Sequence, residues 1–433
     1  MKLIRQEDNM MSKIRYMEPE QTRSSFKHIV IWAMAAVFYL YEVALRVAPA
    51  GLTDQLMQHF NITSTGLGLL VGAYYWSYVL MQLPCGLILD KFGPQKVISL
   101  SALVCGAGTI LFCQADTLVP AIFGRILVGV GSACAFIAAL KVATDWFSPS
   151  RFALIAGLTN MMGTFGGNFA GSPLSYLSEH YGWVNIFTIM GLSGFFIALL
   201  AYLIIEDKPS KSFNNFHNFK HILIMLSMNK QIWLAGIIGG ILYLPLTAFA
   251  ELWGVPFLTR VFDGDHFIGS LTTNLVFIGM AVGGPVFAIL SNKMKSYKRV
   301  LQLTAVFAGC ISLLIVFSPF FDRDSVLSLL FLLGFVIGGQ VLVFSLAKVN
   351  VESSAYGTAM GFTNAIISFV GLFSQVFMGV ILDFVWDGSV SEVGTRIYSV
   401  SAYQYTIIFL PIFMLICMVV LMFVRDKYEK IAV

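Results

Sequence analysis

The sequence predicts an all-α membrane protein with twelve transmembrane helices arranged as two six-helix bundles. Its composition, the length of its apolar runs and a polar break near its middle support this prediction. Hydrophobic residues make up 58% of the 433 residues and charged residues only 12%, whereas a soluble domain carries roughly 25% charged residues. So much apolar surface can be buried only if lipid is the solvent. A soluble fold, a disordered chain and a secreted disulfide scaffold are therefore excluded.

Each apolar run is long enough to cross a hydrocarbon core, which needs about 20 residues. The first six lie at 29–50, 66–89, 97–115, 119–143, 152–176 and 184–205. After a polar stretch, six more lie at 232–259, 268–290, 300–320, 326–349, 358–385 and 403–424. This pattern predicts five parts, namely an N-terminal tail (1–27), a first bundle (28–205), a linker (206–230), a second bundle (231–424) and a C-terminal tail (425–433).

The basic residues predict the orientation, because Lys and Arg accumulate on the cytoplasmic side of a membrane. With both termini cytoplasmic, nearly all of the 27 Lys and Arg fall on that side; the exceptions are Arg46, Arg125, Arg260, Arg323 and Arg396. The basic N-terminal tail has no apolar core before residue 28 and so does not resemble a signal peptide. We expect a multi-pass protein of a bacterial inner membrane. Its expected partner is the lipid bilayer, and we expect no binding of nucleic acid.

The two halves of the sequence repeat one another. Lys141-Val142 is followed by Gly157-Leu158-Thr159-Asn160, and Lys348-Val349 is followed in the second half by Gly361-Phe362-Thr363-Asn364. Such parallel repeats are typical of transporters. The repeat therefore favours transport over the other functions of membrane proteins.

A short motif lies between the second and third apolar runs. It places Gly86 before Asp90-Lys91 and Gly93, so that an acid and a cation stand at a helix end beside a tight turn. This motif closely resembles the cytoplasmic signature of the major facilitator superfamily. The resemblance implies the major facilitator fold, transport by alternating access, and a conformational latch at these four residues. The second half carries a degenerate copy in which Asn292 replaces the acid.

A narrower resemblance begins in the first predicted helix. The segments Tyr41-Glu42-Val43-Ala44-Leu45-Arg46 and Met81-Gln82-Leu83-Pro84 are similar to those of the phagosomal transporter branch of intracellular bacteria. Members of that branch import amino acids or nucleosides. A fainter similarity extends to the lysosomal dipeptide carriers and organic anion carriers of the superfamily.

Four charges lie deep within predicted helices: Glu42, Arg46, Arg125 and Glu251. A charge inside a bilayer is costly and is a functional candidate by default, and the resemblance implies that helices 1, 4 and 7 line a central cavity. We expect Arg46 or Arg125 to bind a substrate carboxylate, because a guanidinium offers matched donors. The alternative is that Glu42 and Arg46, four residues apart, neutralise one another.

The two acids are candidates for proton coupling. Glu251 has no basic residue within four positions on its helix, so we expect it to be the proton carrier, with Glu42 second. Trp253 follows Glu251 closely and is expected to line the substrate pocket. Other aromatic residues either shape this pocket or fill helix interfaces; they are Tyr39, Tyr41, Tyr74, Tyr75 and Trp76.

These features predict a monomeric secondary active transporter. It would import a small zwitterionic or anionic metabolite by proton-coupled symport, with amino acid transport or short-peptide transport favoured. The alternatives are an exporter of drugs or siderophores and an importer of nucleosides or organic anions. No enzyme activity, cofactor or metal is expected, because zinc-protease and nucleotide-binding motifs are missing. The cysteines lie in apolar stretches, where we expect no disulfide; they are Cys85, Cys105, Cys113, Cys134, Cys310 and Cys417.

Overall fold

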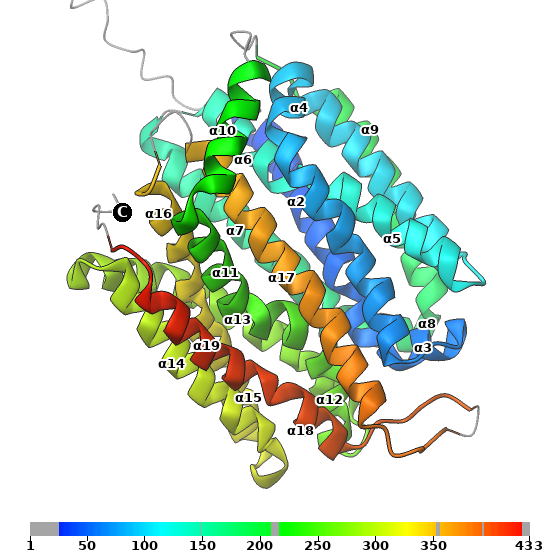
Figure 1. Cartoon of the computed structure of the whole chain (residues 1–433). Helices are drawn as coiled ribbons and strands as arrows, with labels where there is room; N and C mark the ends of the chain where they lie inside the picture. The colour runs from blue at the N-terminus through cyan, green and yellow to red at the C-terminus, as the bar shows by residue number, and fades with distance from the viewer. Residues whose placement is uncertain (1–25, 148, 209–215, 352–355, 392–393, 427–433) are drawn as a thin grey trace, which may run out of the picture.

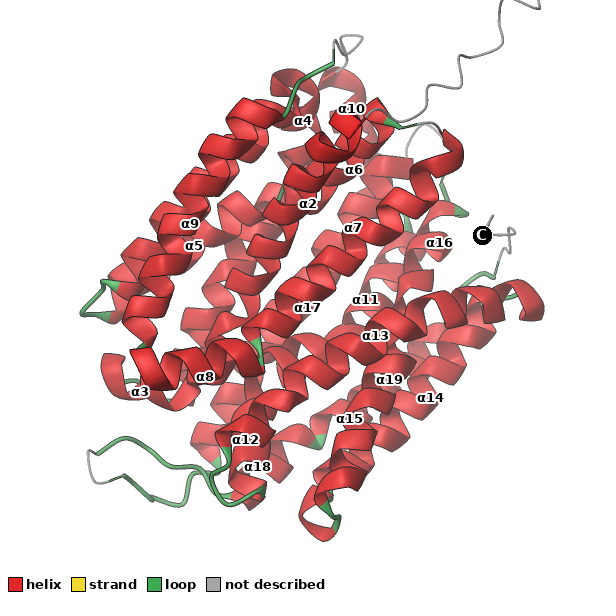
Figure 2. Cartoon of the chain, turned by 180° about the vertical axis from the view of Figure 1, so that it is seen from behind, coloured by secondary structure: helices red, strands yellow, loops and turns green. Residues whose placement is uncertain are grey.

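The computed structural model describes residues 26–147, 149–208, 216–351, 356–391 and 394–426, and this part of the chain is almost entirely helical (Figure 1, Figure 2). Within it, the extended structure is limited to an antiparallel bridge between Val390 and Arg396. The all-helical class predicted from the sequence is thereby confirmed.

The first half contains α2 (Phe26–Val47), η1 (Ala48–Leu52), α3 (Thr53–Phe60), α4 (Ser64–Cys113), α5 (Leu118–Ser132), α6 (Ala135–Trp146), α7 (Pro149–Ala170), α8 (Ser172–Tyr181) and α9 (Trp183–Ile204). Helix α10 (Phe216–Met228) precedes the second half. The second half contains α11 (Lys230–Leu244), η2 (Pro245–Trp253), α12 (Gly254–Val261), α13 (His266–Met294), α14 (Tyr297–Val316), η3 (Ser318–Phe320), α15 (Arg323–Ile337), η4 (Gly338–Val341), α16 (Leu342–Lys348), α17 (Tyr356–Phe384), α18 (Val400–Ile407) and α19 (Phe409–Met422). Helix α10 lies within the predicted linker.

Among the described residues, 10 helical stretches are long and apolar enough to cross a membrane. The longest, α4, contains the second and third predicted spans and changes direction at Gly93, whose φ of 80° is a left-handed conformation that favours glycine. The fifth predicted span falls on α7 and α8, which Gly171 separates. The chain is thus a multi-pass membrane protein, while the number of twelve spans stays a prediction.

The bundle has two ends, which we call the termini face and the opposite face. Helix α2 begins and α19 ends toward the termini face, whereas α3, α8, α12 and α18 lie at the opposite face (Figure 1, Figure 2). Among the described residues at the termini face, Lys27 pairs with Glu206 at 2.7 Å, and Asn229 donates to the carbonyl of Asn350.

The two halves meet closely at the opposite face. Helices α4 and α17 touch there through their backbones: a Cβ added to Gly68 would lie 2.9 Å from the carbonyl oxygen of Gln375. Helices α7 and α8 meet α13 beside them, where Asn274 donates to the carbonyl of Asn168 at 2.8 Å and accepts from the Ser172 amide at 2.9 Å. The structure is therefore closed at the opposite face.

One sequence prediction about the cysteines is wrong. The structure joins Cys85 of α4 to Cys134, which lies between α5 and α6, in a disulfide. Both side chains are buried, and their Cα atoms are 5.5 Å apart. The sequence placed both cysteines correctly in apolar runs, but it could not show that these two helices cross at that depth.

Candidate functional site

Two of the predicted charges meet where the halves join. Arg46 of α2 lies 3.3 Å from the Oε1 atom of Glu251 in η2, and only 12% and 1% of the two side chains are exposed. Tyr75 of α4 donates a 2.5 Å hydrogen bond to the Oε2 atom of the same carboxylate. Arg46 and Tyr75 therefore hold both oxygens of an acid that belongs to the other half.

The local backbone explains how Glu251 reaches this position. Pro245 follows α11 and begins a stretch of π-helix that ends at Trp253. Short π-helical stretches within α-helices often occur at functional sites, and this one is fully buried. It sets Glu251 opposite Arg46.

The ion-pair partner of Arg46 is not the acid one helical turn before it. The spacing of Glu42 and Arg46 allowed a pair within one helix as the alternative to substrate binding, and Glu251 had no basic residue within four positions on its own helix. Among the described residues, the ion pair of Arg46 is formed with Glu251 instead. The spacing rule covers contacts along one helix, whereas this pair crosses from one half to the other.

Glu42 has a different environment. Its Oε1 atom accepts a 2.8 Å hydrogen bond from the Tyr74 hydroxyl, and its Oε2 atom has no hydrogen-bond partner among the described residues. The side chain is 1% exposed. A buried carboxylate oxygen without a hydrogen-bond donor is costly, and a proton on Glu42 would lower this cost.

Arg125 of α5 contacts the end of α2. Its Nη1 atom donates to the carbonyl of Leu45 at 2.9 Å and its Nη2 atom to the carbonyl of Arg46 at 3.3 Å. The guanidinium lies 5.3 Å from the centre of the Tyr74 ring, a distance at which a cation is attracted to the ring face. Arg125 thus fixes the backbone that carries Arg46.

Trp253 lies at the end of η2 and is completely buried. Its indole nitrogen donates to the carbonyl of Gln375 in α17 at 3.0 Å. The structure therefore brings Trp253 into the packing between η2 and α17, two residues beyond Glu251.

The predicted latch forms contacts within the first half. Asp90 at the end of the first part of α4 pairs with Lys141 of α6 at 3.1 Å. The turn after it is held to the end of α9, because the Gln95 amide donates to Asp207 at 2.9 Å. Lys91 is exposed and lies 5.1 Å from the Phe92 ring.

Gly86, the first residue of the latch motif, is not packed closely against another helix. A Cβ added there would meet nothing within 4 Å. Because the halves meet at the opposite face, Gly86 at the termini face has no tightly packed neighbour in this conformation. Gly93, by contrast, has no room for a side chain beside the Asp207 carboxylate.

Comparisons with known proteins agree on one family. The sequence profile of the Major Facilitator Superfamily matches residues 31–375. A probable sulfoacetate transporter of Cupriavidus necator is 23% identical over 83% of this chain and 88% of its own length. A probable galactarate/D-glucarate transporter of Escherichia coli strain K12 is 27% identical, over only 41% of each chain.

Solved structures of transporters share the fold. The inward-facing, occupied structure of a bacterial homologue of the human lysosomal transporter Spinster aligns with a TM-score of 0.74 at 16% identity, covering 92% of this chain and 97% of that chain. The D-xylose–proton symporter aligns with a TM-score of 0.67 at 14% identity, covering 89% and 97%.

Proposed function

Because this chain belongs to the Major Facilitator Superfamily, we propose that it is a secondary transporter of a small organic anion with at least one carboxylate. The chain is a transporter and not an enzyme, in line with its family and with the transporters that it resembles. The names of its relatives, which refer to sulfoacetate and sugar acids, favour the organic-anion alternative over the amino acids and peptides that the sequence suggested.

One observation supports this substrate class most directly. Arg46 forms an ion pair with one oxygen of the Glu251 carboxylate and Tyr75 donates to the other, and a guanidinium and a hydroxyl can contact a substrate carboxylate in the same way. Glu251 would then occupy the anion site while no substrate is bound. An incoming carboxylate would displace Glu251 from Arg46 and so loosen a contact between the halves.

Residues around the Arg46–Glu251 pair would support substrate binding and proton coupling. Arg125 positions Arg46 through the carbonyls that it binds, and the buried indole of Trp253 sets the shape of the segment that carries Glu251. Glu42 holds a proton in this conformation, and Glu251 accepts one when the substrate displaces it. Substrate and proton would then move together, as in symport.

We also propose how the protein lies in its membrane. The basic residues favour cytoplasmic termini in a bacterial inner membrane, so the closed opposite face would point outward. This conformation would correspond to the inward-facing state of an importer that acts as a monomer. The pair of Asp90 and Lys141 would then be rearranged when the termini face closes.

A thermal-shift screen of the purified protein tests the substrate class. Bound ligand raises the stability of the folded state by mass action, so sulfoacetate, galactarate and D-glucarate should raise the melting temperature in a concentration-dependent way. The Arg46→Lys protein should lose this response, because a single ammonium cannot reproduce the guanidinium fork. Stabilisation by amino acids, dipeptides or nucleosides, with none by the organic anions, would refute the proposal.

A further inference from the structure

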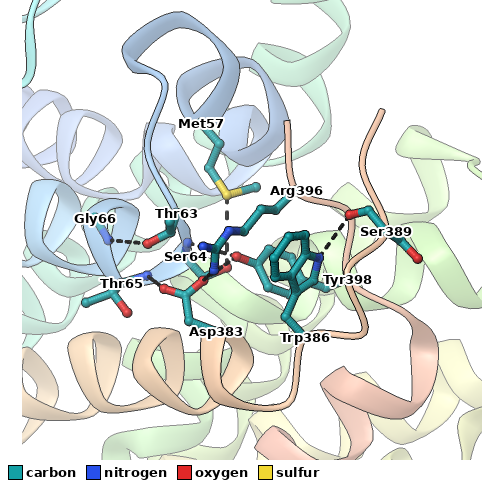
Figure 3. A network of polar contacts seen from close by, with 10 residues as sticks. All are labelled: Met57, Thr63, Ser64, Thr65, Gly66, Asp383, Trp386, Ser389, Arg396 and Tyr398. Carbon is teal, nitrogen blue, oxygen red and sulfur yellow. Dashed lines mark hydrogen bonds and ion pairs between the residues drawn. The ribbon is translucent and has the colours of Figure 1, made fainter. Parts of the chain in front are cut away.

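A second acidic residue joins the two halves, far from the central charges. Asp383 lies near the end of α17, at the opposite face, and its carboxylate points toward the beginning of α4 (Figure 3). Its Oδ2 atom accepts from the backbone amide of Thr65 at 2.8 Å. Its Oδ1 atom accepts from the Tyr398 hydroxyl at 2.5 Å and from Arg396 at 3.3 Å.

The beginning of α4 needs such partners. The first amides of a helix have no acceptor within the helix, and their dipoles attract negative charge. The N-cap side chain of Thr63 accepts only a long bond of 3.5 Å, from Gly66. The Ser64 amide instead donates to the Tyr398 hydroxyl at 3.1 Å, so the second half provides acceptors for two of these amides.

The loop after α17 holds this acid in place. The guanidinium of Arg396 lies 4.2 Å from the centre of the Trp386 ring, and the Trp386 indole donates to the Ser389 carbonyl at 2.9 Å. If the halves separated, Arg396 would remain paired with Asp383 while the α4 amides met water. Release therefore leaves no unpaired buried charge, which makes the contact reversible.

We propose that Asp383, together with Tyr398, is a lock that holds the opposite face closed by capping α4 from the other half. The Gly68 contact supports this, because it brings the α4 and α17 backbones close enough for a short side chain to reach. The ion pair of Asp54 with Arg260 crosses the same seam at 3.4 Å. With 42% and 34% of the two side chains exposed, that pair contributes less than the Asp383 contact, because water screens it.

Spin-label distances measured without substrate test the lock. Gln58 of α3 and Phe267 of α13 are exposed on different halves at the opposite face and would carry the labels in lipid nanodiscs. Asp383→Asn removes the charge and one acceptor, so the population with this face open should rise roughly tenfold relative to the closed population. Tyr398→Phe leaves the Ser64 amide without its acceptor and should shift the distances in the same direction, but less.

Asp387→Asn is the matched control. Asp387 is an acid of the same loop, and its recorded hydrogen bond is to the nearby Ser389 amide rather than to the first half. Equal distances in wild type, Asp383→Asn and Tyr398→Phe would overturn the proposal, as would an equal shift in Asp387→Asn. If the Asp383→Asn protein does not fold, the spin-label distances in the Tyr398→Phe protein test the proposal on their own. The inference rests on alternating access but not on the anion site, so a failure of the ligand screen would leave this result unaffected.

Discussion

Arg46 and Glu251 form an ion pair between the two halves of the protein, with 3.3 Å between the Nη2 and Oε1 atoms. Any movement that separates the halves at this depth must break the pair. Removing one partner of a buried pair leaves an uncompensated charge, at a cost of roughly 3–5 kcal/mol. A ligand that replaces Glu251 with its own carboxylate avoids this cost, so substrate binding and movement of the halves are linked.

Glu42 is predicted to be needed for proton coupling. Glu42→Gln keeps an oxygen that can accept from Tyr74, so the variant should fold normally, but it cannot release a proton. Accumulation of substrate driven by a pH gradient should be lost in proteoliposomes, whereas counterflow should continue. Glu179→Gln, which alters an exposed acid, is the control. Full accumulation by Glu42→Gln would remove Glu42 from the mechanism.

Arg125 is predicted to act through the backbone of α2. Arg125→Lys cannot donate to the Leu45 and Arg46 carbonyls in the same fork, and an unsatisfied buried carbonyl costs about 1–3 kcal/mol. The melting temperature of the ligand-free protein should therefore fall. The affinity for organic anions should fall moderately as well. A large loss of affinity with unchanged stability would instead show that Arg125 touches the substrate directly.

Asp90 is predicted to affect the rate of transport rather than folding. Asp90→Asn removes the pair with Lys141, and both side chains are partly exposed, so the stability loss should be within about 1 kcal/mol. Initial uptake rates should fall while ligand affinity stays the same, because the contact must rearrange when the termini face closes. A normal uptake rate would exclude a latch at this position.

The sequence was sufficient for the membrane class and for most helix positions, because apolar runs of spanning length have few other interpretations. It also singled out Arg46 and Glu251, which form an ion pair where the halves meet. Their pairing was not predictable, because the spacing of four residues identifies side-chain pairs only within one helix. Arg46 pairs with Glu251, which lies far away in the chain.

The contacts of Asp383 and of the disulfide were missed for a related reason. Asp383 is a single acid at the end of an apolar run, a position common for residues that contact water. Its role depends on the α4 amides that lie 318 residues away in the chain. Local sequence patterns carry no information about which helix ends meet across a membrane protein.

The affinity of the Glu251→Gln variant for organic anions tests the central claim most directly. The claim is that Glu251 occupies the carboxylate site formed by Arg46 and Tyr75. Titration calorimetry with sulfoacetate and galactarate would compare wild type, Glu251→Gln and Arg46→Lys. We predict that Glu251→Gln binds about tenfold more tightly than wild type, since no charged competitor remains, and that Arg46→Lys binds more weakly. Unchanged or weaker binding by Glu251→Gln, or undiminished binding by Arg46→Lys, would contradict the account.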